Sequence, residues 1–308
     1  MKIIFAGTPE FAVPPLKALI ASDHQVVAVY TQPDRPQGRG RKIIPTPVKA
    51  VAESAGIPVF QPESFKDPEA IEQLRSLRPD LMVVVAYGLI LPKAVIDIPL
   101  KGCINIHASL LPRWRGAAPI QRSILEGDEL TGVTIMYIEP KLDAGPMILK
   151  AETAIMANEV AGDLHDRLAL IGADTLMRAL PAIEEGTQTP VTQDEAFVTY
   201  AAKISKDEAR LDFKEPAIAL ARKIRAFNPW PVAETRYRDE PLRIWQADVV
   251  EDNAIEVPGT LCMKDGNLMI ATKQGYLRIL ELQLPGGRRI TAKDFLNTRP
   301  ELPVILTS

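Results

Sequence analysis

Short apolar runs alternate with amphipathic stretches along residues 1–180 of the chain. The apolar runs are rich in β-branched residues and predict strands at positions 2–6, 26–30, 57–60, 81–86, 102–106, 133–138 and 147–150. The stretches between them have the spacing of helices, predicted at positions 9–21, 46–55, 67–77 and 160–180, the last of which ends or kinks at Pro181. Strands that alternate with helices at this spacing form parallel sheets. We therefore predict a Rossmann-like, doubly wound α/β fold with a mainly parallel sheet.

The pattern changes after position 205. One amphipathic helix at 217–227 precedes short strands, which are predicted at 232–237, 242–250, 259–263, 267–272 and 276–283. Several short strands with regular turns are typical of a small barrel, and 308 residues exceed the usual length of one domain. We expect three segments, namely an α/β domain at 1–188, a linker at 189–205 and a smaller, OB-like β-barrel domain at 206–308.

Composition narrows the class of protein. The chain is 46% hydrophobic and 24% charged, as ordinary globular proteins are. Cys103 and Cys262 are far apart and have no C-x-x-C partner, which argues against a disulfide framework and a structural zinc site. No apolar run is long enough for a membrane span, and nothing resembles a signal peptide. We expect a cytoplasmic protein, monomeric by default, that uses no metal and no membrane.

The formal net charge of −3 gives no sign of a nucleic-acid partner, but two local stretches carry cations without acids. They are residues 35–42, with Arg35, Arg39, Arg41 and Lys42, and residues 101–122, with Lys101, Arg113, Arg115 and Arg122. Taken alone, a stretch of this kind is more often a solvated basic face than a binding surface.

The densest chemical signal is Asn105-Ile-His107, at the end of the predicted strand 102–106. Residues two apart in a strand point to the same side, so the Asn105 amide and the His107 imidazole share a face. Open α/β sheets gather their ligands at the carboxyl ends of strands, where an imidazole can donate to a developing oxyanion or relay a proton. His24 and His165 lie in a turn and within a helix, and we interpret both as structural.

Asp143 is the candidate acid, in a D-x-G turn that follows the predicted strand 133–138. That strand can lie beside the one that carries Asn105 and His107. Ser109 lacks the G-x-S-x-G context of a nucleophile, and Gly7 lacks the G-x-G-x-x-G pattern of a dinucleotide site. The trio suits transfer of a one-carbon acyl group to an amine without a metal or a covalent enzyme intermediate. It indicates a type of reaction but no substrate.

The order Asn-x-His-x-Ser-Leu-Leu-Pro at 105–112, then Arg115-Gly116, then Asp143-x-Gly145 resembles the 10-formyltetrahydrofolate-dependent formyltransferases. The resemblance covers essentially the whole chain. It implies that 10-formyltetrahydrofolate is the co-substrate and that Asn105, His107 and Asp143 are catalytic. It also implies folate contacts, from Ser109, Leu110, Leu111 and Pro112 and from the strand end at Tyr87, Gly88 and Leu89.

The insertion at 32–42 resembles the loop with which some members of this family enter the acceptor end of a methionyl initiator tRNA. It implies tRNA contacts from Arg39, with Arg41 and Lys42 on phosphates. The segment 112–121 is similar to the same members. The expected reaction is therefore transfer of the formyl group to the α-amino group of methionyl initiator tRNA.

The C-terminal domain is implied to hold the tRNA. Its cations Arg222, Lys223 and Arg225 are expected on one face. Three alternatives stay open: the same chemistry on a sugar nucleotide or a purine precursor, hydrolysis of the formyl group to water, and a non-catalytic tRNA-binding protein. Relatives that act on sugar nucleotides lack the basic insertion, and those that act on purine precursors lack the second domain. A formyl hydrolase normally has an extension that this chain lacks. A protein that only binds tRNA would have no use for the catalytic trio.

Overall fold

The computed structural model describes residues 1–37, 42–252, 254–298 and 300–307. The chain forms two compact units. The first unit comprises Met1–Pro119, Leu130–Ala154 and His165–Ala201, and the second Ile120–Glu129, Ile155–Leu164 and Ala202–Ser308. Among the described helices, none combines the length and the apolar composition that a membrane span requires.

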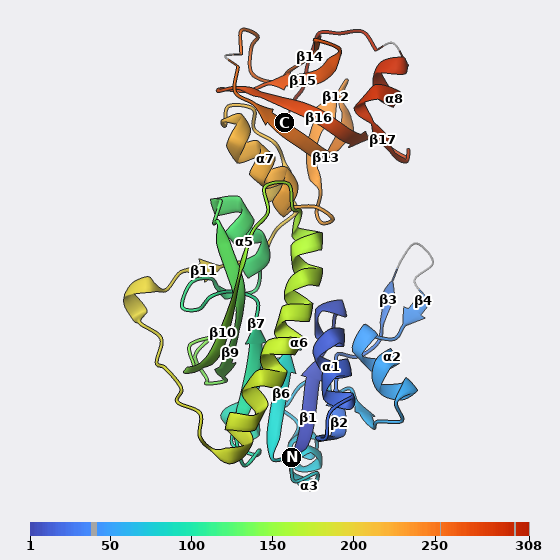
Figure 1. Ribbon diagram of the computed structural model, residues 1–308. Coiled ribbons are helices and arrows are strands. Elements are labelled where there is room, and N and C mark those ends of the chain that lie inside the picture. Colours follow the sequence, from blue (N-terminus) through green and yellow to red (C-terminus); the bar gives the residue numbers. More distant parts are fainter. Residues whose placement is uncertain (38–41, 253, 299, 308) are drawn as a thin grey trace. The chain divides into compact units, whose positions relative to one another are not determined.

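The first unit is built on a seven-stranded sheet (Figure 1). Its strands are β1 (Lys2–Gly7), β2 (Gln25–Tyr30), β5 (Val59–Phe60), β6 (Leu81–Val85), β7 (Cys103–His107), β9 (Leu130–Tyr137) and β10 (Met147–Ala154), in the order β10-β9-β7-β6-β1-β2-β5. The five strands from β7 to β5 are parallel, whereas β9 and β10 are antiparallel to their neighbours. The predicted mainly parallel sheet is confirmed. The predicted pairing of the strand that precedes Asp143, β9, with the strand that contains His107, β7, is confirmed as well.

Helices cover both faces of this sheet. They are α1 (Val13–Ile20) after the 3-10 turn Glu10–Ala12, α2 (Pro47–Ser54), α3 (Pro68–Ser76), α4 (Lys93–Ile96) and α6 (Ala161–Glu185). Leu74 of α3 and Val95 of α4 share a core with Met82 of the sheet. On the opposite face, Gly172 of α6 lies so close to Ile106 that a Cβ atom there would be 2.9 Å from its methyl group. The doubly wound architecture follows.

Helix α6 shows where the sequence pattern was misleading. It continues through Pro181 to Glu185, whereas the prediction placed its end or a kink at Pro181. Proline removes one helical hydrogen bond, but Ile183 of the last turn is fully buried, and this packing outweighs the loss. The helix α5 (Pro119–Glu126) was not predicted.

Residues 186–201 are an ordered part of the first unit. Strand β11 (Tyr200–Ala201) pairs in parallel with β8 (Arg115–Gly116), and Val191 forms a bridge with Met147. The stretch is polar and rich in threonine, so its sequence resembles a linker, yet its backbone hydrogen bonds are made with the segments around the predicted site.

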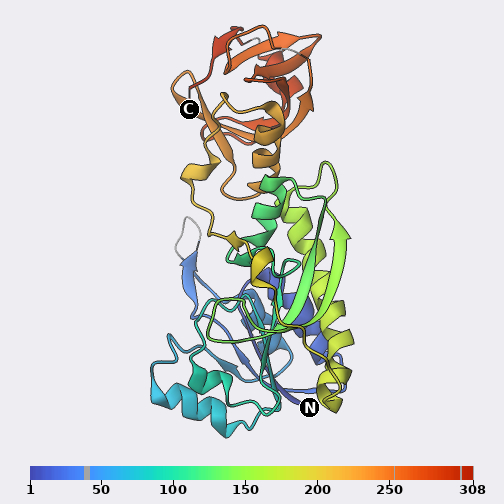
Figure 2. The same cartoon turned by 90° about the vertical axis from the view of Figure 1, so that its left-hand side faces the viewer.

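The second unit contains a curled antiparallel sheet (Figure 2). It consists of β12 (Ala233–Tyr237), β13 (Glu240–Val250), β14 (Thr260–Lys264), β15 (Asn267–Ala271), β16 (Tyr276–Gln283), β17 (Arg289–Thr291) and β18 (Val304–Ile305), with the helices α7 (Ala217–Ala226) and α8 (Ala292–Asn297). Leu220 and Ile224 of α7 pack in one core with Leu242, Ile244 and Leu277 of the sheet. The predicted OB-like architecture and its five longer strands are confirmed.

Candidate active site at the end of strand β7

One row of side chains across three strands forms the floor of the candidate site. Asn105 of β7 is in register with Val84 of β6 on one side and with Met136 of β9 on the other. All three line one cavity of about 290 Å³. The register of the sheet therefore places a single amide in an otherwise apolar row.

Two loops complete this cavity, which we call the β7 cavity. The loop after β6 contributes Leu89, Ile90 and Leu91, and the loop after β9 contributes Ile138, Glu139, Pro140, Leu142 and Asp143. The walls are thus mainly apolar, with few polar groups, as in most small-molecule sites. Asn105 is half-buried, and its amide has no hydrogen bond to another residue in the described part of the chain.

His107 is held in one orientation by a backbone group. Its ring is 6% exposed, and its Nε2 atom lies 2.8 Å from the carbonyl oxygen of Trp114. A carbonyl oxygen only accepts, so Nε2 carries a proton and donates it there. The other ring nitrogen, Nδ1, lies 3.8 Å from Oδ2 of Asp143. Nδ1 is therefore the nitrogen of His107 that faces the acid.

Asp143 lies in the loop between β9 and β10. Its Oδ2 atom accepts a hydrogen bond of 2.9 Å from the Gly116 amide, and its backbone has a left-handed φ of 45°. Gly145 allows this turn, because a Cβ atom there would lie 1.9 Å from the carbonyl oxygen of Tyr137. The structure thus brings the three predicted catalytic residues together, with Asn105 and Asp143 in one cavity and His107 beside Asp143.

The Asp143 turn is held by Gln193, a residue that no sequence pattern singles out. Gln193 donates to the backbone oxygens of Asp143 at 2.8 Å and of Gly145 at 2.9 Å, and it accepts from Nε of Arg115 at 2.9 Å. Arg115 is fully buried and also contacts Glu195 at 3.0 Å. An isolated glutamine in a polar stretch has no signature in sequence. The match of Arg115 to the family motif was the only signal nearby.

The Ser-Leu-Leu-Pro segment is anchored from β9 and β10. Thr134 donates to the Ser109 carbonyl at 2.7 Å and accepts from the Leu111 amide at 3.1 Å. The Lys150 ammonium donates to the Leu111 carbonyl, and burial holds the pKa of Lys150 below its usual value. Ser109 itself donates to the carbonyl of Arg113 at 2.6 Å. These contacts are internal, and Ser109, Leu110, Leu111 and Pro112 are not among the residues that line the β7 cavity.

Of the three residues predicted to form a folate wall at the end of β6, one lines the β7 cavity and two do not. Leu89 lines the β7 cavity, whereas Tyr87 is 2% exposed and lies beneath it in the core. Burial raises the pKa of the Tyr87 hydroxyl. The Tyr87 carbonyl accepts from Thr8 at 2.8 Å, and Gly88 has a φ of 85°, which a glycine adopts without strain. Tyr87 and Gly88 therefore shape the loop that carries Leu89.

The basic insertion forms a hairpin of β3 (Arg35–Gln37) and β4 (Lys42–Ile44). Arg39 and Arg41 lie outside the described residues, and of Lys42 only the backbone, in β4, is described. The base of the hairpin is held by Asp34, which contacts the Lys49 ammonium at 2.6 Å and the Gln61 amide at 2.8 Å. The hydrogen bond from Lys49 holds the pKa of Asp34 below its usual value.

A second cavity lies in the second unit and has a different lining. It has a volume of about 480 Å³, and we call it the tryptophan cavity. Its walls are formed by Lys206, Asp207, Ala209, Arg210, Pro229, Trp230, Pro231, Val232, Glu234, Arg243 and Trp245. Trp230 is 51% exposed. The combination of two indole rings with three cations distinguishes this cavity from the apolar β7 cavity.

The cations of helix α7 do not gather on one free face. Arg222 and Arg225 donate to the carbonyl oxygens of Glu126 and Glu159, whereas Lys223 forms an ion pair of 2.9 Å with Glu215. The second basic stretch of the sequence, which begins at Lys101, does not form a solvated basic face either. Arg115 is fully buried there, and the Arg113 guanidinium stacks on the Trp114 ring at 4.3 Å.

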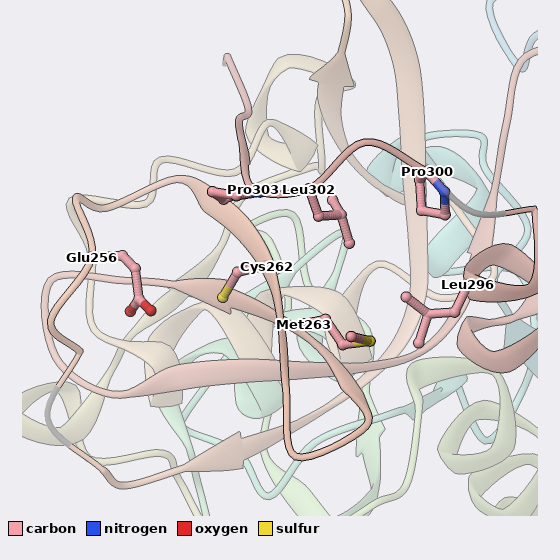
Figure 3. A pocket seen from close by; sticks show the side chains of 7 residues that line it. All are labelled: Glu256, Cys262, Met263, Leu296, Pro300, Leu302 and Pro303. Carbon is pink, nitrogen blue, oxygen red and sulfur yellow. The ribbon is translucent and has the colours of Figure 1, made fainter.

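A third cavity, of about 570 Å³, is lined mainly by apolar side chains of the second unit (Figure 3). They are Cys262, Met263, Leu296, Pro300, Leu302 and Pro303, together with the carboxylate of Glu256. Glu256 accepts from the Tyr276 hydroxyl, and burial raises the pKa of the Cys262 thiol. None of the residues predicted to be functional lines it.

The chain belongs to the formyl transferase family. The family described as "Formyl transferase" matches residues 1–180, and the family described as "Formyl transferase, C-terminal domain" matches residues 203–300. The chain is therefore an enzyme of formyl transfer, and the resemblance found in its motifs is confirmed.

Two relatives named methionyl-tRNA formyltransferase match nearly the whole chain. The protein of Methylococcus capsulatus is 60% identical over 297 residues, which cover 96% of each chain. The protein of Ectopseudomonas mendocina is 53% identical over 302 residues, 98% of this chain and 96% of the relative.

Solved structures show the same fold at lower identity. WlaRD, a sugar 3N-formyl transferase solved with dTDP and 5-N-formyl-THF, superposes with a TM-score of 0.68 over 94% of this chain and 99% of that one, at 18% identity. Glycinamide ribonucleotide transformylase 1 of Symbiobacterium toebii has a TM-score of 0.52, with 63% of this chain and 94% of that chain covered. At 18% identity these likenesses concern the fold alone.

Proposed function

We propose that this enzyme transfers the formyl group of 10-formyltetrahydrofolate to the α-amino group of methionyl initiator tRNA, in the cytoplasm. The observation that carries the chemistry is that a carboxylate and an amide with no hydrogen-bond partner among the described residues line the same small cavity, with a buried imidazole beside the carboxylate. The identity to relatives of this name over nearly the whole chain supports the substrates.

The Asn105 amide is the group proposed to stabilise the oxyanion. When an amine attacks a formyl carbon, negative charge develops on the carbonyl oxygen, and a fixed donor in an apolar cavity stabilises it strongly. Asn105 meets this requirement because β7 fixes its backbone, and Val84 and Met136 flank it in the sheet. Its donors are not used within the described residues.

His107 and Asp143 are proposed to manage the proton. The Trp114 carbonyl commits Nε2 of His107 to donation, so Nδ1 is the atom that gives or takes a proton on the side of Asp143. Oδ2 of Asp143 already accepts from Gly116, which leaves Oδ1 without a hydrogen-bond partner among the described residues. Oδ1 is therefore the oxygen proposed to accept a hydrogen bond from the attacking amine.

The proton balance defines the task of this pair. A bond forms between the amine nitrogen and the formyl carbon, and the bond from that carbon to N10 of the folate breaks, with its electron pair remaining on N10. The attacking nitrogen loses one proton and N10 gains one. An acceptor and a donor are both needed within the site, and Asp143 and His107 supply the two groups.

The β7 cavity fits part of a folate. Its volume of about 290 Å³ is at the lower limit for small-molecule sites, so it suits a compact ring system rather than a whole folate. Leu89, Ile90 and Leu142 offer apolar walls to a flat ring. We propose that the backbone of the 86–92 loop and the Ser-Leu-Leu-Pro segment contact the remaining part, as the family resemblance implies.

The tRNA contacts are proposed to come from the basic hairpin and from the second unit. In the sequence, Arg39 and Arg41 fall between β3 and β4, and Lys42 is the first residue of β4. In the second unit, the tryptophan cavity combines indole faces with Lys206, Arg210 and Arg243. Aromatic faces stack on bases and cations bind phosphates, so this lining suits a nucleic acid although Asp207 and Glu234 also belong to it.

A sugar nucleotide is the second candidate acceptor, because the WlaRD structure shares the fold. The comparison favours tRNA: the sugar formyltransferase is 18% identical, whereas relatives named for methionyl-tRNA are 53% and 60% identical. The basic hairpin has no evident use in binding a small sugar nucleotide.

Transfer of labelled formyl from 10-formyltetrahydrofolate to charged initiator tRNA tests the proposal, with charged elongator methionyl-tRNA as the matched control. We expect fast transfer to the initiator and little to the elongator. Absence of transfer to either tRNA, with folate bound and an amino sugar nucleotide formylated, would reject the proposed acceptor.

A further inference from the structure

Gln193 and Arg115 form a buried connection that the proposed chemistry does not use. Gln193 is 4% exposed and Arg115 is fully buried, although both are polar. Burying such groups is unfavourable unless their hydrogen bonds are made, so their partners indicate why they are there.

The partners of Gln193 converge on the turn that carries Asp143. Both hydrogens of its amide are donated, one to the Asp143 carbonyl and one to the Gly145 carbonyl. Its oxygen accepts from Nε of Arg115, which is itself held by an ion pair with Glu195. Because the carboxamide is planar, these three bonds fix the amide relative to both ends of the D-x-G turn.

The same segment also supports the second tie to Asp143. The Gly116 amide donates to Oδ2 of Asp143, and Gly116 pairs with Ala201 in the short β8–β11 sheet. A Cβ atom at Gly116 would lie 2.7 Å from the Ala201 carbonyl oxygen, so the two backbones are in close contact. The backbone and the carboxylate of Asp143 are thus both located by residues 193–201.

The conformation of Asp143 explains why it needs this support. Its φ of 45° is one that residues other than glycine seldom adopt, and surrounding contacts must maintain it. Without the bonds from Gln193, the turn loses two hydrogen bonds, one at Asp143 and one at Gly145. A shift of the turn moves the carboxylate relative to His107 and Asn105.

We infer that Gln193 is a positioning residue for Asp143 and that Arg115 orients Gln193. The inference rests on the proposed function, because it assumes that Asp143 acts in formyl transfer. Gln193 touches neither substrate in this account. It acts only through the placement of the carboxylate.

Two substitutions separate positioning from general stability. Gln193→Met has a similar length and removes all three hydrogen bonds. Gln193→Glu keeps an acceptor for Arg115 but removes both donors to the turn. We expect both to lower kcat by roughly ten- to a hundredfold, as misplaced catalytic groups do. We expect KM for folate and for tRNA to stay within about twofold, because binding surfaces are unchanged.

Gln188→Met is the matched control. Gln188 lies in the same segment, and its amide donates to the Tyr137 hydroxyl at 2.8 Å without contacting the Asp143 turn. If Gln193 were only structural, both methionine variants would lower the melting temperature and leave the kcat of the folded fraction intact. We expect the fall in kcat only at position 193.

A double-mutant cycle tests the role of Arg115. If Arg115 acts by orienting Gln193, then Arg115→Met lowers kcat, and the double variant with Gln193→Met is little slower than the Gln193→Met variant alone. Independent, additive losses would contradict this part of the inference.

The outcomes distinguish this inference from the proposed function. A wild-type enzyme that formylates no methionyl-tRNA refutes both. An active wild type with Gln193→Met and Gln193→Glu of unchanged kcat, or with raised KM alone, refutes the positioning role and leaves the proposed function intact. If Gln193→Met does not fold, the kcat of Gln193→Glu decides, because this variant keeps its partner Arg115.

Discussion

The β7 cavity and the tryptophan cavity differ in how their polar groups are arranged. In the first, about 290 Å³ of mainly apolar wall surrounds Asn105 and Asp143. In the second, about 480 Å³ is bordered by indole rings and by three cations, which are Lys206, Arg210 and Arg243. A few fixed polar groups in an apolar cavity are suited to stabilising a transition state. Many charged and aromatic groups are suited to binding a nucleic acid.

The two cavities also differ in how firmly their side chains are held. Asp143 and His107 are tied to backbone groups of Gly116 and Trp114. Trp230 is half exposed, and Arg210 forms its ion pair with the exposed Asp207. In the proposed function, the groups of the first set must be exact in position, whereas those of the second set adapt to a large partner. Substitutions in the first cavity should change kcat, and those in the second should change KM.

The largest expected effect is that of Asn105→Ala. Removing one oxyanion donor typically lowers kcat by roughly a hundred- to a thousandfold, and we expect that range here. Steady-state transfer with both substrates varied gives kcat and KM separately. Asn267→Ala, at the exposed first residue of β15 in the second unit, is the control and should leave kcat unchanged. A rise in KM for tRNA without a fall in kcat would break the contrast between the cavities.

Gly145→Ala should be the next largest. The added Cβ atom would lie 1.9 Å from a backbone oxygen, so the turn must move, at a cost of at least about 1–3 kcal/mol. Thermal unfolding should show a lower melting temperature, with a fall in kcat because Asp143 is two residues away.

Gly186→Ala is the matched control for that change. Gly186 has a positive φ of 73°, unlike Gly145, and a Cβ atom there meets no described atom within 4 Å. We expect a small loss of stability from strain and an unchanged kcat. Equal losses of kcat in the two variants would show that close packing at Gly145 is not what shapes the site.

Trp230→Ala tests the second cavity. Loss of one stacked base typically costs about 1–3 kcal/mol, so we expect KM for tRNA to rise roughly five- to 150-fold with kcat unchanged. Met263→Ala, an exposed apolar residue of the third cavity, is the control. An unchanged KM in Trp230→Ala would remove the tryptophan cavity from the tRNA-binding surface.

The smallest expected effect concerns the base of the basic hairpin. The Lys49 hydrogen bond lowers the pKa of Asp34, so this pair stabilises the fold above the unfolded pKa of about 3.9, and its contribution is lost as pH falls through the lower, folded pKa. Lys49→Met should lower stability by at most about 1 kcal/mol at pH 7, since both groups are partly exposed.

Melting curves at pH 7 and pH 3 measure this difference. The gap between wild type and Lys49→Met should narrow on acidification. Lys93→Met, which removes an exposed pair with Asp97, is the control and should change the melting temperature little. A gap that widens at pH 3 would contradict the assigned sign.

The strands and the trio were predictable because their signals are local. An apolar run such as 81–85 specifies a buried strand, and a two-residue spacing places Asn105 and His107 on one side of β7. In open sheets, site residues usually follow the carboxyl ends of parallel strands, but Asp143 lies near Asn105 and His107 for another reason. Strand β9 is antiparallel to β7, so Asp143 arrives by a loop that returns across the sheet rather than from a parallel strand end.

The supporting residues were not predictable, because their roles depend on distant partners. Gln193 and Thr199 lie in a polar stretch without periodicity, yet they bond to Asp143 and to the Trp114 amide, which are 50 and 85 residues away. Helix α6 likewise passes Pro181 because of the packing of Ile183. Local pattern carries no information on such contacts.

The most direct test of the central claim is a single-turnover measurement on Asp143→Asn, with enzyme, 10-formyltetrahydrofolate and methionyl initiator tRNA preassembled. Asparagine keeps an oxygen for the Gly116 amide but cannot accept the proton. We predict that the rate of formyl transfer falls by roughly a hundred- to ten-thousandfold while the dissociation constants of folate and tRNA stay unchanged. An unchanged rate in the preassembled complex would show that the chemistry does not depend on Asp143.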